Sequence, residues 1–273
     1  MTTAFHGDPW IKSDLHARLR RHAAAGTLVF GATRWDGVSG SPLGVSAESD
    51  DCADYAARFG YPLALTPLLD MMTAYIAPER ALADTLAWVE TVSPGADLSW
   101  VPLGIAEEML VRMGAADHAP SRHAAVLDLQ RRDMAGETIT RADWTALRRE
   151  MEAATDDAHG PEAVALRACA MACWPLRTSR SVVASLVQMW QTGAPPSPDF
   201  SVADRIQAEE TLHAIIAEMR PRREDIPGLF RDRDPDLSRR YEAELRRVNL
   251  IAEQRIAALP PLILHHLAAA GTP

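Results

Sequence analysis

The chain has 273 residues, of which 47% are hydrophobic and 24% are charged, a composition typical of a globular protein and not of a disordered one. Aspartate and glutamate (37) outnumber lysine and arginine (28), and the resulting net charge of −9 argues against nonspecific nucleic-acid binding, which depends on a basic surface. Three cysteines are too few for a disulfide framework.

The sequence predicts a reduced, soluble protein of the cytoplasm. Its first residues lack the basic segment followed by an apolar segment that a signal peptide would have. No apolar run approaches the ~20 residues that a membrane span needs. We therefore expect neither a membrane nor a nucleic acid as a partner. Lys12 is the only lysine, so any Schiff-base or lysine–phosphate chemistry would have to use this residue.

The N-terminal region predicts one helix followed by a small β-hairpin. Ser13 is a favourable N-terminal cap of the helix, and Gly26 can end it in a left-handed conformation. The segment after it is rich in β-branched and aromatic residues, and Asp36-Gly37 is a dipeptide favoured in type I′ turns. We expect the hairpin near residues 27–46, with an irregular or edge strand as its second half.

The middle of the chain predicts a series of helices joined by short connections. Prolines stand where first helical turns are expected, each just before an apolar run with helical periodicity, and glycines stand where helices should end. Short connections favour antiparallel packing of successive helices. The predicted fold class is therefore all-α, a multi-helix bundle or helical array with one small hairpin. The predicted helices span residues 62–77, 79–92, 100–113, 120–135, 141–159, 161–174 and 178–192.

A proline-rich segment divides the predicted helices into two groups. Residues 193–201 read GAPPSPDFS, which is typical of a linker. We expect residues 1–193 to form the hairpin and the main helical bundle. Residues 202–273 would form a C-terminal helical arm, packed on the bundle or extending from it.

The arm itself predicts two long helices. The first should span residues 202–219. An arginine- and aspartate-rich loop separates it from the second, which should span residues 236–259 and end at Pro260 and Pro261, because proline breaks a helix interior.

Three short phrases between residues 20 and 175 resemble an uncharacterised bacterial family of alanine-rich helical proteins. The corresponding residues are Phe59, Gly60, Tyr61 and Pro62; Pro94, Gly95, Ala96, Asp97 and Leu98; and Trp144 and Arg148. The chain departs from the family pattern in the helix 62–77, which lacks the usual acidic phrase, and residues 194–273 have no counterpart. Since the family has no assigned activity, the resemblance implies helices and no particular chemistry.

One pair of residues has the spacing of metal ligands. Glu210 and His213 stand three apart in a predicted helix, a spacing that recurs in helical bundles with carboxylate-bridged metal pairs. Such centres need a second pair and further carboxylates, and this is the single Glu-x-x-His of the chain. The alternative is a solvated glutamate beside a partly buried histidine. Residues that would supply further ligands if the fold brought them close are Glu107, Glu108, Asp156, Asp157 and His159.

Cys169 and Cys173 share one face of a predicted helix. A thiolate pair can hold a soft metal such as copper(I) or zinc when other ligands complete the set. The alternative is that cysteine and alanine alternate here as small residues at a close helix contact. Nucleophile elbows, glycine-rich dinucleotide loops and Walker-type loops are all absent from the sequence.

The positions of the tryptophans favour packing in the core over a role in ligand binding. Five lie in the central helices, mostly in phase with leucine or methionine. We expect these five to fill the core and Trp10 and Trp35 to be more exposed. The five central tryptophans are Trp88, Trp100, Trp144, Trp174 and Trp190.

Three functions are compatible with this sequence. The sequence does not establish whether the protein is an enzyme. The first is an interaction or accessory module that binds a protein partner or a second copy through residues 202–267, since the mixed charges of residues 220–247 favour a solvated docking face. The second is a metal-dependent helical enzyme that uses Glu210 and His213, with a divalent metal as cofactor. The third is a small-molecule-binding protein with a pocket of tryptophan and methionine between helices.

Overall fold

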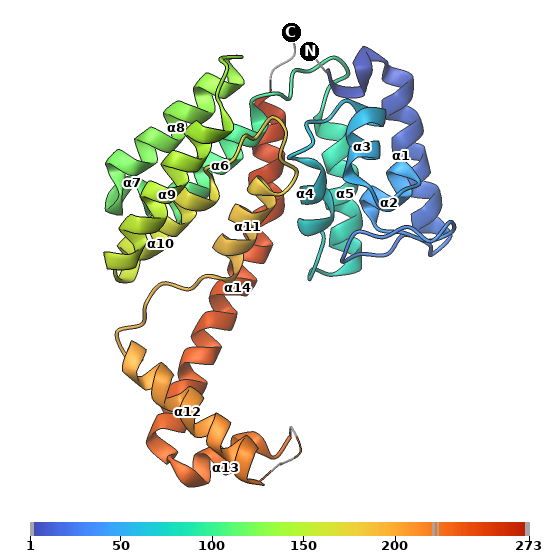
Figure 1. Cartoon of the computed structure of the whole chain (residues 1–273). Helices are drawn as coiled ribbons and strands as arrows, with labels where there is room; N and C mark the ends of the chain where they lie inside the picture. The colour runs from blue at the N-terminus through green and yellow to red at the C-terminus, as the bar shows by residue number, and fades with distance from the viewer. Residues whose placement is uncertain (1–2, 220–221, 223, 271–273) are drawn as a thin grey trace. The chain divides into compact units, whose positions relative to one another are not determined.

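The computed structural model describes residues 3–219, 222 and 224–270, and within these residues it is helical, with no β-strand (Figure 1). The prediction of an all-α fold is therefore confirmed. None of the helices in the described part of the chain is both long and apolar enough to cross a membrane. A short 3-10 helix at Ala4–Gly7 precedes α1 (Pro9–Ala24), α2 (Pro42–Ala47), α3 (Cys52–Phe59), α4 (Thr66–Met71), α5 (Pro78–Thr91), α6 (Val101–Arg112), α7 (Ala115–His118), α8 (Pro120–Met134), α9 (Arg141–Asp157), α10 (Gly160–Met171), α11 (Val182–Thr192), α12 (Val202–Met219), α13 (Ile226–Arg233) and α14 (Pro235–Ala269).

The chain forms two compact units. The first consists of the described residues of Met1–Gln191 and Arg255–Pro273, and the second consists of those of Thr192–Gln254. Helix α14 contributes its first part to the second unit and its last part to the first unit.

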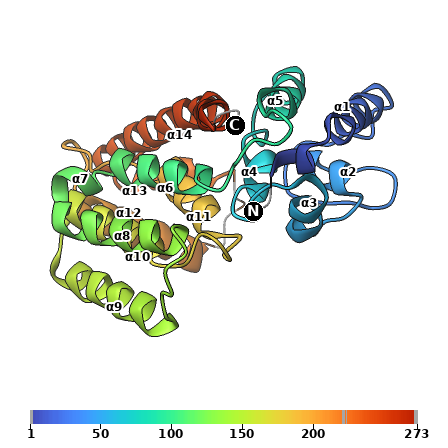
Figure 2. The same ribbon diagram turned by 90° about the horizontal axis from the view of Figure 1, so that it is seen from above.

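In the first half of the first unit, α1 packs against α2 and α5, and α2 also packs against α3 and α4 (Figure 2). Aromatic side chains fill the space between these helices. The Trp88 ring stacks on Tyr61, with ring centroids 5.4 Å apart, and its indole N–H donates to the Tyr55 hydroxyl at 3.0 Å. Because all three side chains are almost fully buried, they anchor this half of the core.

In the second half of the first unit, α10 packs against α7, α8 and α9 (Figure 2). Helix α11 and the last part of α14 join the same core. Leu186 of α11 and Leu259, Ile263 and Leu267 of α14 are buried within it. The C-terminal turns of α14 are therefore held by apolar burial.

The predicted hairpin at residues 27–46 is wrong. The turn at Asp36 and Gly37 does form, and the Asp36 side chain accepts hydrogen bonds from the N–H groups of Val38 and Ser39. Only isolated β-bridges flank it, between Leu28 and Gly40 and between Trp35 and Gly40. The expected return strand is helix α2 instead.

Helix α2 forms because its first residues satisfy a helix start. The Ser41 side chain caps it by accepting from the Gly44 N–H at 3.2 Å, and Pro42 stands in the first turn, where its missing N–H costs nothing. A strand would instead need that N–H in a ladder. The serine–proline pair therefore decides the local structure against the β-propensity around it.

Other boundaries also differ from the prediction. Helix α1 starts at Pro9 with Asp8 as its cap, and not at Ser13. The helix expected over 62–77 contracts to α4, and α14 continues through Pro260 and Pro261 instead of ending there. Proline in a helix interior costs about 3 kcal/mol. Buried apolar side chains on both sides of the prolines, Leu259 and Ile263 among them, hold the helix against the core and offset this cost.

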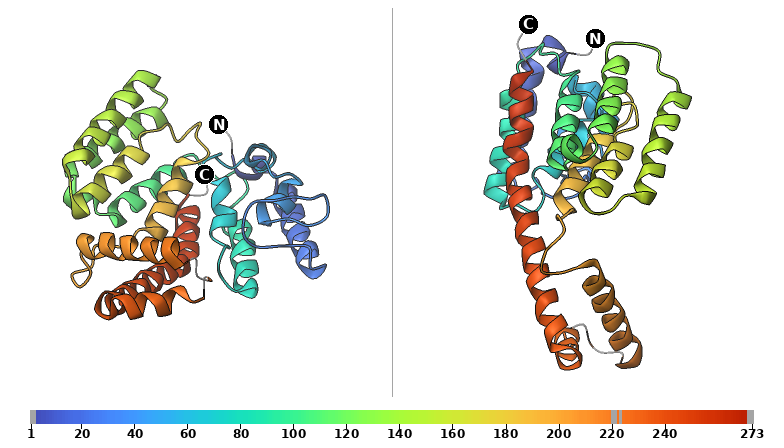
Figure 3. Two further views of the ribbon diagram at one scale, coloured as in Figure 1. Left: turned by 60° about the horizontal axis from the view of Figure 1, so that its bottom comes forward. Right: turned by 90° about the vertical axis from the view of Figure 1, so that its left-hand side faces the viewer.

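The second unit has a small core of its own between α12, α13 and the first turns of α14 (Figure 3). Ion pairs join its helices, since Arg240 of α14 lies 2.6 Å from Asp204 of α12, and Arg233 of α13 lies 2.6 Å from Glu218 of α12. The buried members of this core are Phe200, Ala208, Ile215, Phe230 and Leu237.

Candidate ligand-binding groove

A groove of about 630 Å³ lies in the first unit and is lined by residues of α9, α10, α11 and the turn after α10. Its volume falls in the range of small-molecule sites, about 300–1,000 Å³. Apolar atoms line its floor and charged side chains stand among them. The lining residues are Arg148, Glu152, Thr155, Asp156, Arg167, Ala170, Met171, Trp174 and Met189.

The α9–α10 pair that carries most of this lining is specified locally. A capping box starts α9, in which the Thr140 hydroxyl accepts from the Asp143 N–H while the Asp143 carboxylate accepts from the Thr140 N–H. Gly160, the first residue of α10, adopts a φ of +59°, and Pro161 follows in the first turn. Small buried residues of α10, such as Ala165 and Cys169, permit close packing against its neighbours.

The backbone of Trp174 is held in place by one buried side chain from α8. The Gln130 amide group donates to the carbonyl oxygens of Ala172 and Trp174, at 2.7 and 2.8 Å. Gln130 is 1% exposed, and its hydrogen bond to Ala172 is buried and costly to lose, whereas the one to Trp174 is partly buried. Gln130 therefore positions the turn that presents the Trp174 ring to the groove.

Trp174 is 44% exposed, so a large apolar side chain is open to solvent beside the groove. The Arg148 guanidinium carbon lies 4.2 Å from the ring centroid, which is a close cation–π contact. Arg148 also pairs with Glu152 at 3.4 Å, one helical turn further along α9. The ion pair with Glu152 therefore helps to hold the Arg148 guanidinium over the Trp174 ring.

Two other charged groups in the groove lack an ionic partner within the described residues. Arg167 donates to the carbonyl oxygen of Ala163 on its own helix, and no acidic group pairs with it in this part of the chain. Asp156, near the end of α9, makes no hydrogen bond or ion pair with any residue that the structure describes. Both side chains belong to exposed residues, so a ligand can reach them from solvent.

Cys169 of α10 and Cys173, just beyond its end, are not among the groove's lining residues and are free thiols buried in the core. Burial raises the pKa of Cys169 to about 11 and that of Cys173 to about 12. The Cys173 thiol donates to the Cys169 carbonyl oxygen at 3.2 Å. Protonated thiols are poor metal ligands and nucleophiles, so the geometry favours their use as small core residues.

Glu210 and His213 lie on α12 in the second unit, and both are exposed. No group of three or more histidine, cysteine, aspartate or glutamate side chains in the described residues is placed to hold a metal ion. The divalent-metal site at this pair therefore stays a prediction, and no third ligand has been found for it among those residues.

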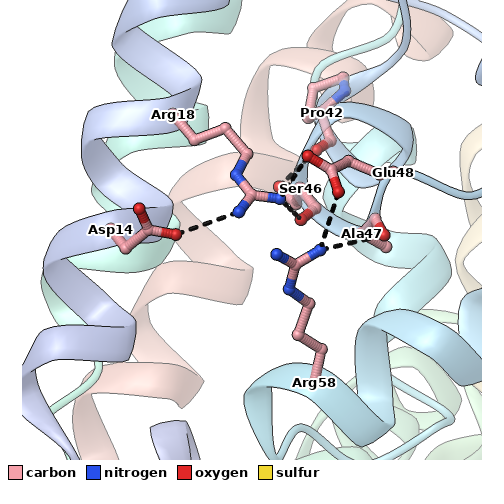
Figure 4. Close-up of polar contacts among 7 residues, drawn as sticks. All are labelled: Asp14, Arg18, Pro42, Ser46, Ala47, Glu48 and Arg58. Atoms are coloured by element: carbon pink, nitrogen blue, oxygen red, sulfur yellow. Dashed lines mark hydrogen bonds and ion pairs between the residues drawn. The ribbon is translucent and has the colours of Figure 1, made fainter. Parts of the chain in front are cut away.

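A polar cluster around Arg18 serves the fold (Figure 4). The Arg18 guanidinium pairs with Asp14 and Glu48, each at 3.1 Å, and donates to the carbonyl oxygen of Ser46. Arg58 binds the other oxygen of Glu48 and the carbonyl oxygen of Ala47. The two cations satisfy the last carbonyl groups of α2, which a helix of six residues otherwise leaves open.

Asp70 of α4 holds the loop that leads into α2. Its carboxylate accepts from the hydroxyls of Thr33 and Ser41, at 2.6 and 2.8 Å, and from the Leu43 N–H at 3.0 Å. Burial raises the pKa of Asp70, and these hydrogen bonds oppose the rise without cancelling it. Three donors on one buried carboxyl group show that this aspartate is fully engaged in the fold.

Lys12 is engaged in the same way. Its ammonium donates to the carbonyl oxygens of Glu90 and Val92 at the end of α5, both at 2.8 Å. Burial lowers its pKa, and Glu90 acts in the opposite direction. The only lysine of the chain therefore caps a helix end in this structure.

The tryptophans follow the prediction in part. Trp88, Trp144 and Trp190 are buried, as expected, and Trp10 is exposed, whereas Trp100 and Trp174 are about half exposed, against expectation. Trp174 stands beyond the end of α10, directly before Pro175. Helical periodicity does not apply to a residue outside a helix, so it could not predict the exposure of Trp174.

Comparisons with known proteins do not add to this geometry. The chain matches no model of a known protein family, no curated protein and no solved structure.

Proposed function

We propose that the protein binds a small organic molecule through the groove of the first unit, with the apolar body of the ligand against Trp174. The observation that carries the proposal is the exposure of large apolar side chains inside a hollow of ligand size. Trp174 is 44% exposed and Met171 is 38% exposed, and both line the groove. Covering these side chains with a ligand would remove apolar surface from water, at about 25 cal/mol per Å².

The composition of the lining supports an adaptable apolar contact. Methionine side chains are flexible and polarisable, so Met171 and Met189 adjust to ligands of different outline. The indole ring supplies a rigid flat surface for stacking. The proposed ligand therefore has a ring system or a compact aliphatic body.

The charges of the groove define the polar end of the ligand. Arg148 is paired with Glu152, whereas Arg167 has only a backbone carbonyl as partner within the described residues. A carboxylate, sulfonate or phosphate on the ligand would give Arg167 an ionic partner. Asp156 offers a second polar contact on the same groove, for a hydroxyl or an amine.

Two fluorescent probes that share one apolar body test the proposal. N-phenyl-1-naphthylamine is neutral, and 1-anilinonaphthalene-8-sulfonate adds an anionic group to the same ring system. Both should bind the wild-type protein and increase in fluorescence. Trp174→Ala should weaken both probes by about 5- to 100-fold, because stacking on an aromatic side chain contributes about 1–3 kcal/mol.

Trp100→Ala is the matched control. Trp100 is 48% exposed and is not part of the groove lining, so its removal should leave both affinities unchanged. Arg167→Gln should weaken the sulfonate several-fold and leave the neutral probe unaffected. Equal effects of Trp100→Ala and Trp174→Ala, or wild-type protein that binds neither probe, would contradict the proposal. Circular dichroism of each variant checks that the fold is retained.

An interaction module that binds a protein partner or a second copy through residues 202–267 is a second candidate function. It is favoured by one observation in the second unit. Exposed aliphatic side chains gather on α12, where Val202 is 75% exposed and Ile206 is 52% exposed. A native mass measurement of the purified chain at several concentrations tests whether this unit brings copies together.

A further inference from the structure

Five exposed side chains follow one another along α12 with the spacing of a coiled-coil seam. They lie four, three, four and three residues apart, which is the a/d repeat of a heptad. We call this set the α12 seam. Its members are Val202, Ile206, Glu209, His213 and Ile216.

The seam is separate from the face of α12 that packs inside the second unit. Ala208 and Ile215 of α12 are fully buried in the small core, whereas Ile206 and Ile216 are 52% and 46% exposed. The side chains of Glu209 and His213 form no hydrogen bond or ion pair with any residue that the structure describes, and both residues are exposed. The fold of the unit therefore uses one face of α12 and leaves the seam without a partner among those residues.

The last four residues of the seam, from Ile206 to Ile216, match an antiparallel copy of themselves. In an antiparallel pair with its two-fold axis at Thr211, Ile206 lies opposite Ile216 of the second copy. Glu209 then lies opposite His213 of the second copy, and the symmetry repeats both contacts. Aliphatic residues meet aliphatic residues at the outer layers, and a carboxylate meets an imidazole at the central layers.

A parallel pair would be less favourable. Each residue would then face its own counterpart, so the two Glu209 carboxylates would lie opposite each other in the interface. Like charges placed directly opposite cost free energy and exclude that register. The polar residues at the centre of the seam therefore specify the antiparallel orientation.

We infer that the α12 seam pairs with the α12 seam of a second copy of this chain, antiparallel and with two-fold symmetry. This inference rests on the second candidate function, interaction through residues 202–267, and is independent of the groove. The paired positions, Ile206 to Ile216, extend over about three helical turns, or roughly 15 Å. A contact of this small size predicts a weak dimer, with a dissociation constant on the order of 100 μM.

Sedimentation equilibrium of the full chain measures the dimer, and single substitutions locate it. Ile206→Glu places a carboxylate opposite Ile216 of the second copy, and the two-fold symmetry repeats this unfavourable contact. We therefore expect the dissociation constant to rise about 100-fold. Leu250→Glu is the matched control, because Leu250 is 54% exposed on α14 in the same unit and lies outside the seam. This control should leave the dissociation constant unchanged.

A charge exchange tests the register. Glu209→Lys places an ammonium opposite His213, and His213→Glu places two carboxylates opposite each other, so each should weaken the dimer about tenfold or more. The double variant with both substitutions restores an attractive pair in the antiparallel register and should recover dimer formation. In a parallel register the double variant would oppose like charges in both layers and recover nothing.

A wild-type chain that stays monomeric up to millimolar concentration would overturn the inference, as would a dimer that Leu250→Glu weakens as much as Ile206→Glu. Failure of the double variant to recover would overturn the antiparallel register. A monomeric chain that binds another protein from an extract, and loses it on Ile206→Glu, would overturn the dimer while the broader interaction function still held. Circular dichroism and thermal unfolding show that each variant is folded.

Discussion

The guanidinium carbon of Arg148 lies 4.2 Å from the centroid of the Trp174 ring, which joins a side chain of α9 to the turn beyond α10. The two residues are 26 positions apart, and nothing in the local sequence pairs them. The guanidinium lies over the ring and covers part of the indole. It also joins the two sides of the groove through one side-chain interaction.

A double-mutant cycle with Arg148→Met and Trp174→Leu measures this contact. We expect a coupling energy of about 0.5–1 kcal/mol, because a partly exposed cation–π pair contributes that much to stability. The measurement is the free energy of unfolding in urea for the wild type, the two single variants and the double variant. Arg149→Met, at an exposed neighbouring arginine, is the control and should not couple to Trp174. Zero coupling between Arg148 and Trp174 would contradict the assignment.

Gln130→Leu should weaken the fold and the groove together. The substitution removes the side-chain donor from the buried carbonyl oxygen of Ala172 and from the partly buried carbonyl oxygen of Trp174. The expected loss is about 1–3 kcal/mol of unfolding free energy, since a buried acceptor loses its partner. The neutral naphthyl probe should also bind more weakly, because the turn that carries the Trp174 ring is no longer held. Normal probe affinity in a folded variant would show that Gln130 does not position Trp174.

Asp70→Asn should change how stability depends on pH. Burial raises the pKa of Asp70 in the folded protein above its unfolded value. Because the folded pKa is raised, the contribution of Asp70 to stability is largest below the ordinary aspartate pKa. This contribution is lost as pH rises through the folded pKa. The asparagine variant lacks this ionisation and should lose less stability over that range.

Urea unfolding of the wild type and of Asp70→Asn, from acidic to neutral pH, makes this comparison. All other titrating groups are common to the two proteins, so the difference between their unfolding free energies reports Asp70. We expect this difference to move in favour of the variant as pH rises. A difference that is constant with pH would show that the pKa of Asp70 is the same in the folded and unfolded chains.

Gly44→Ala should be severely destabilising, because a Cβ at this position would lie 1.9 Å from the carbonyl oxygen of Arg34. Helix α2 or the Arg34 backbone would have to shift, at a cost of about 3 kcal/mol. Gly228→Ala in α13 is the matched control, since no atom lies within 4 Å of the added Cβ. That change should be neutral or stabilise by up to about 1 kcal/mol. Thermal unfolding of both variants checks the contrast, and equal melting temperatures would contradict it.

The helices were predictable because the signals that specify them are local. Pro78 and Pro120 start α5 and α8, and Gly60 ends α3 with a φ of +69°. Apolar residues with a repeat of three to four positions mark the buried face of each helix. These signals depend on neighbours within a few residues, so they can be read from one sequence.

The hairpin was not predictable from the same kind of signal. The strand propensity near Trp35 is real, yet Ser41 and Pro42 start a helix, and Ser41 also donates to Asp70, 29 residues away. Similarly, the prolines at 260 and 261 should end α14, but apolar burial on both sides keeps it continuous. For α2 a local helix start outweighed the β-propensity and a long-range hydrogen bond added to it, whereas for α14 long-range burial outweighed the local signal of the prolines.

The sequence by itself determined the helical class, the positions of most helices and the absence of a recognisable catalytic motif, because periodicity and caps are short-range properties of the chain. Only the tertiary structure decided that Arg148, Trp174 and Met189 line one groove, because these residues stand on separate elements and meet only when α9, α10 and α11 pack. It also decided that one face of α12 is used inside its unit while the α12 seam is exposed. Which apolar side chains stay exposed depends on which neighbours cover them, and that is a property of packing alone.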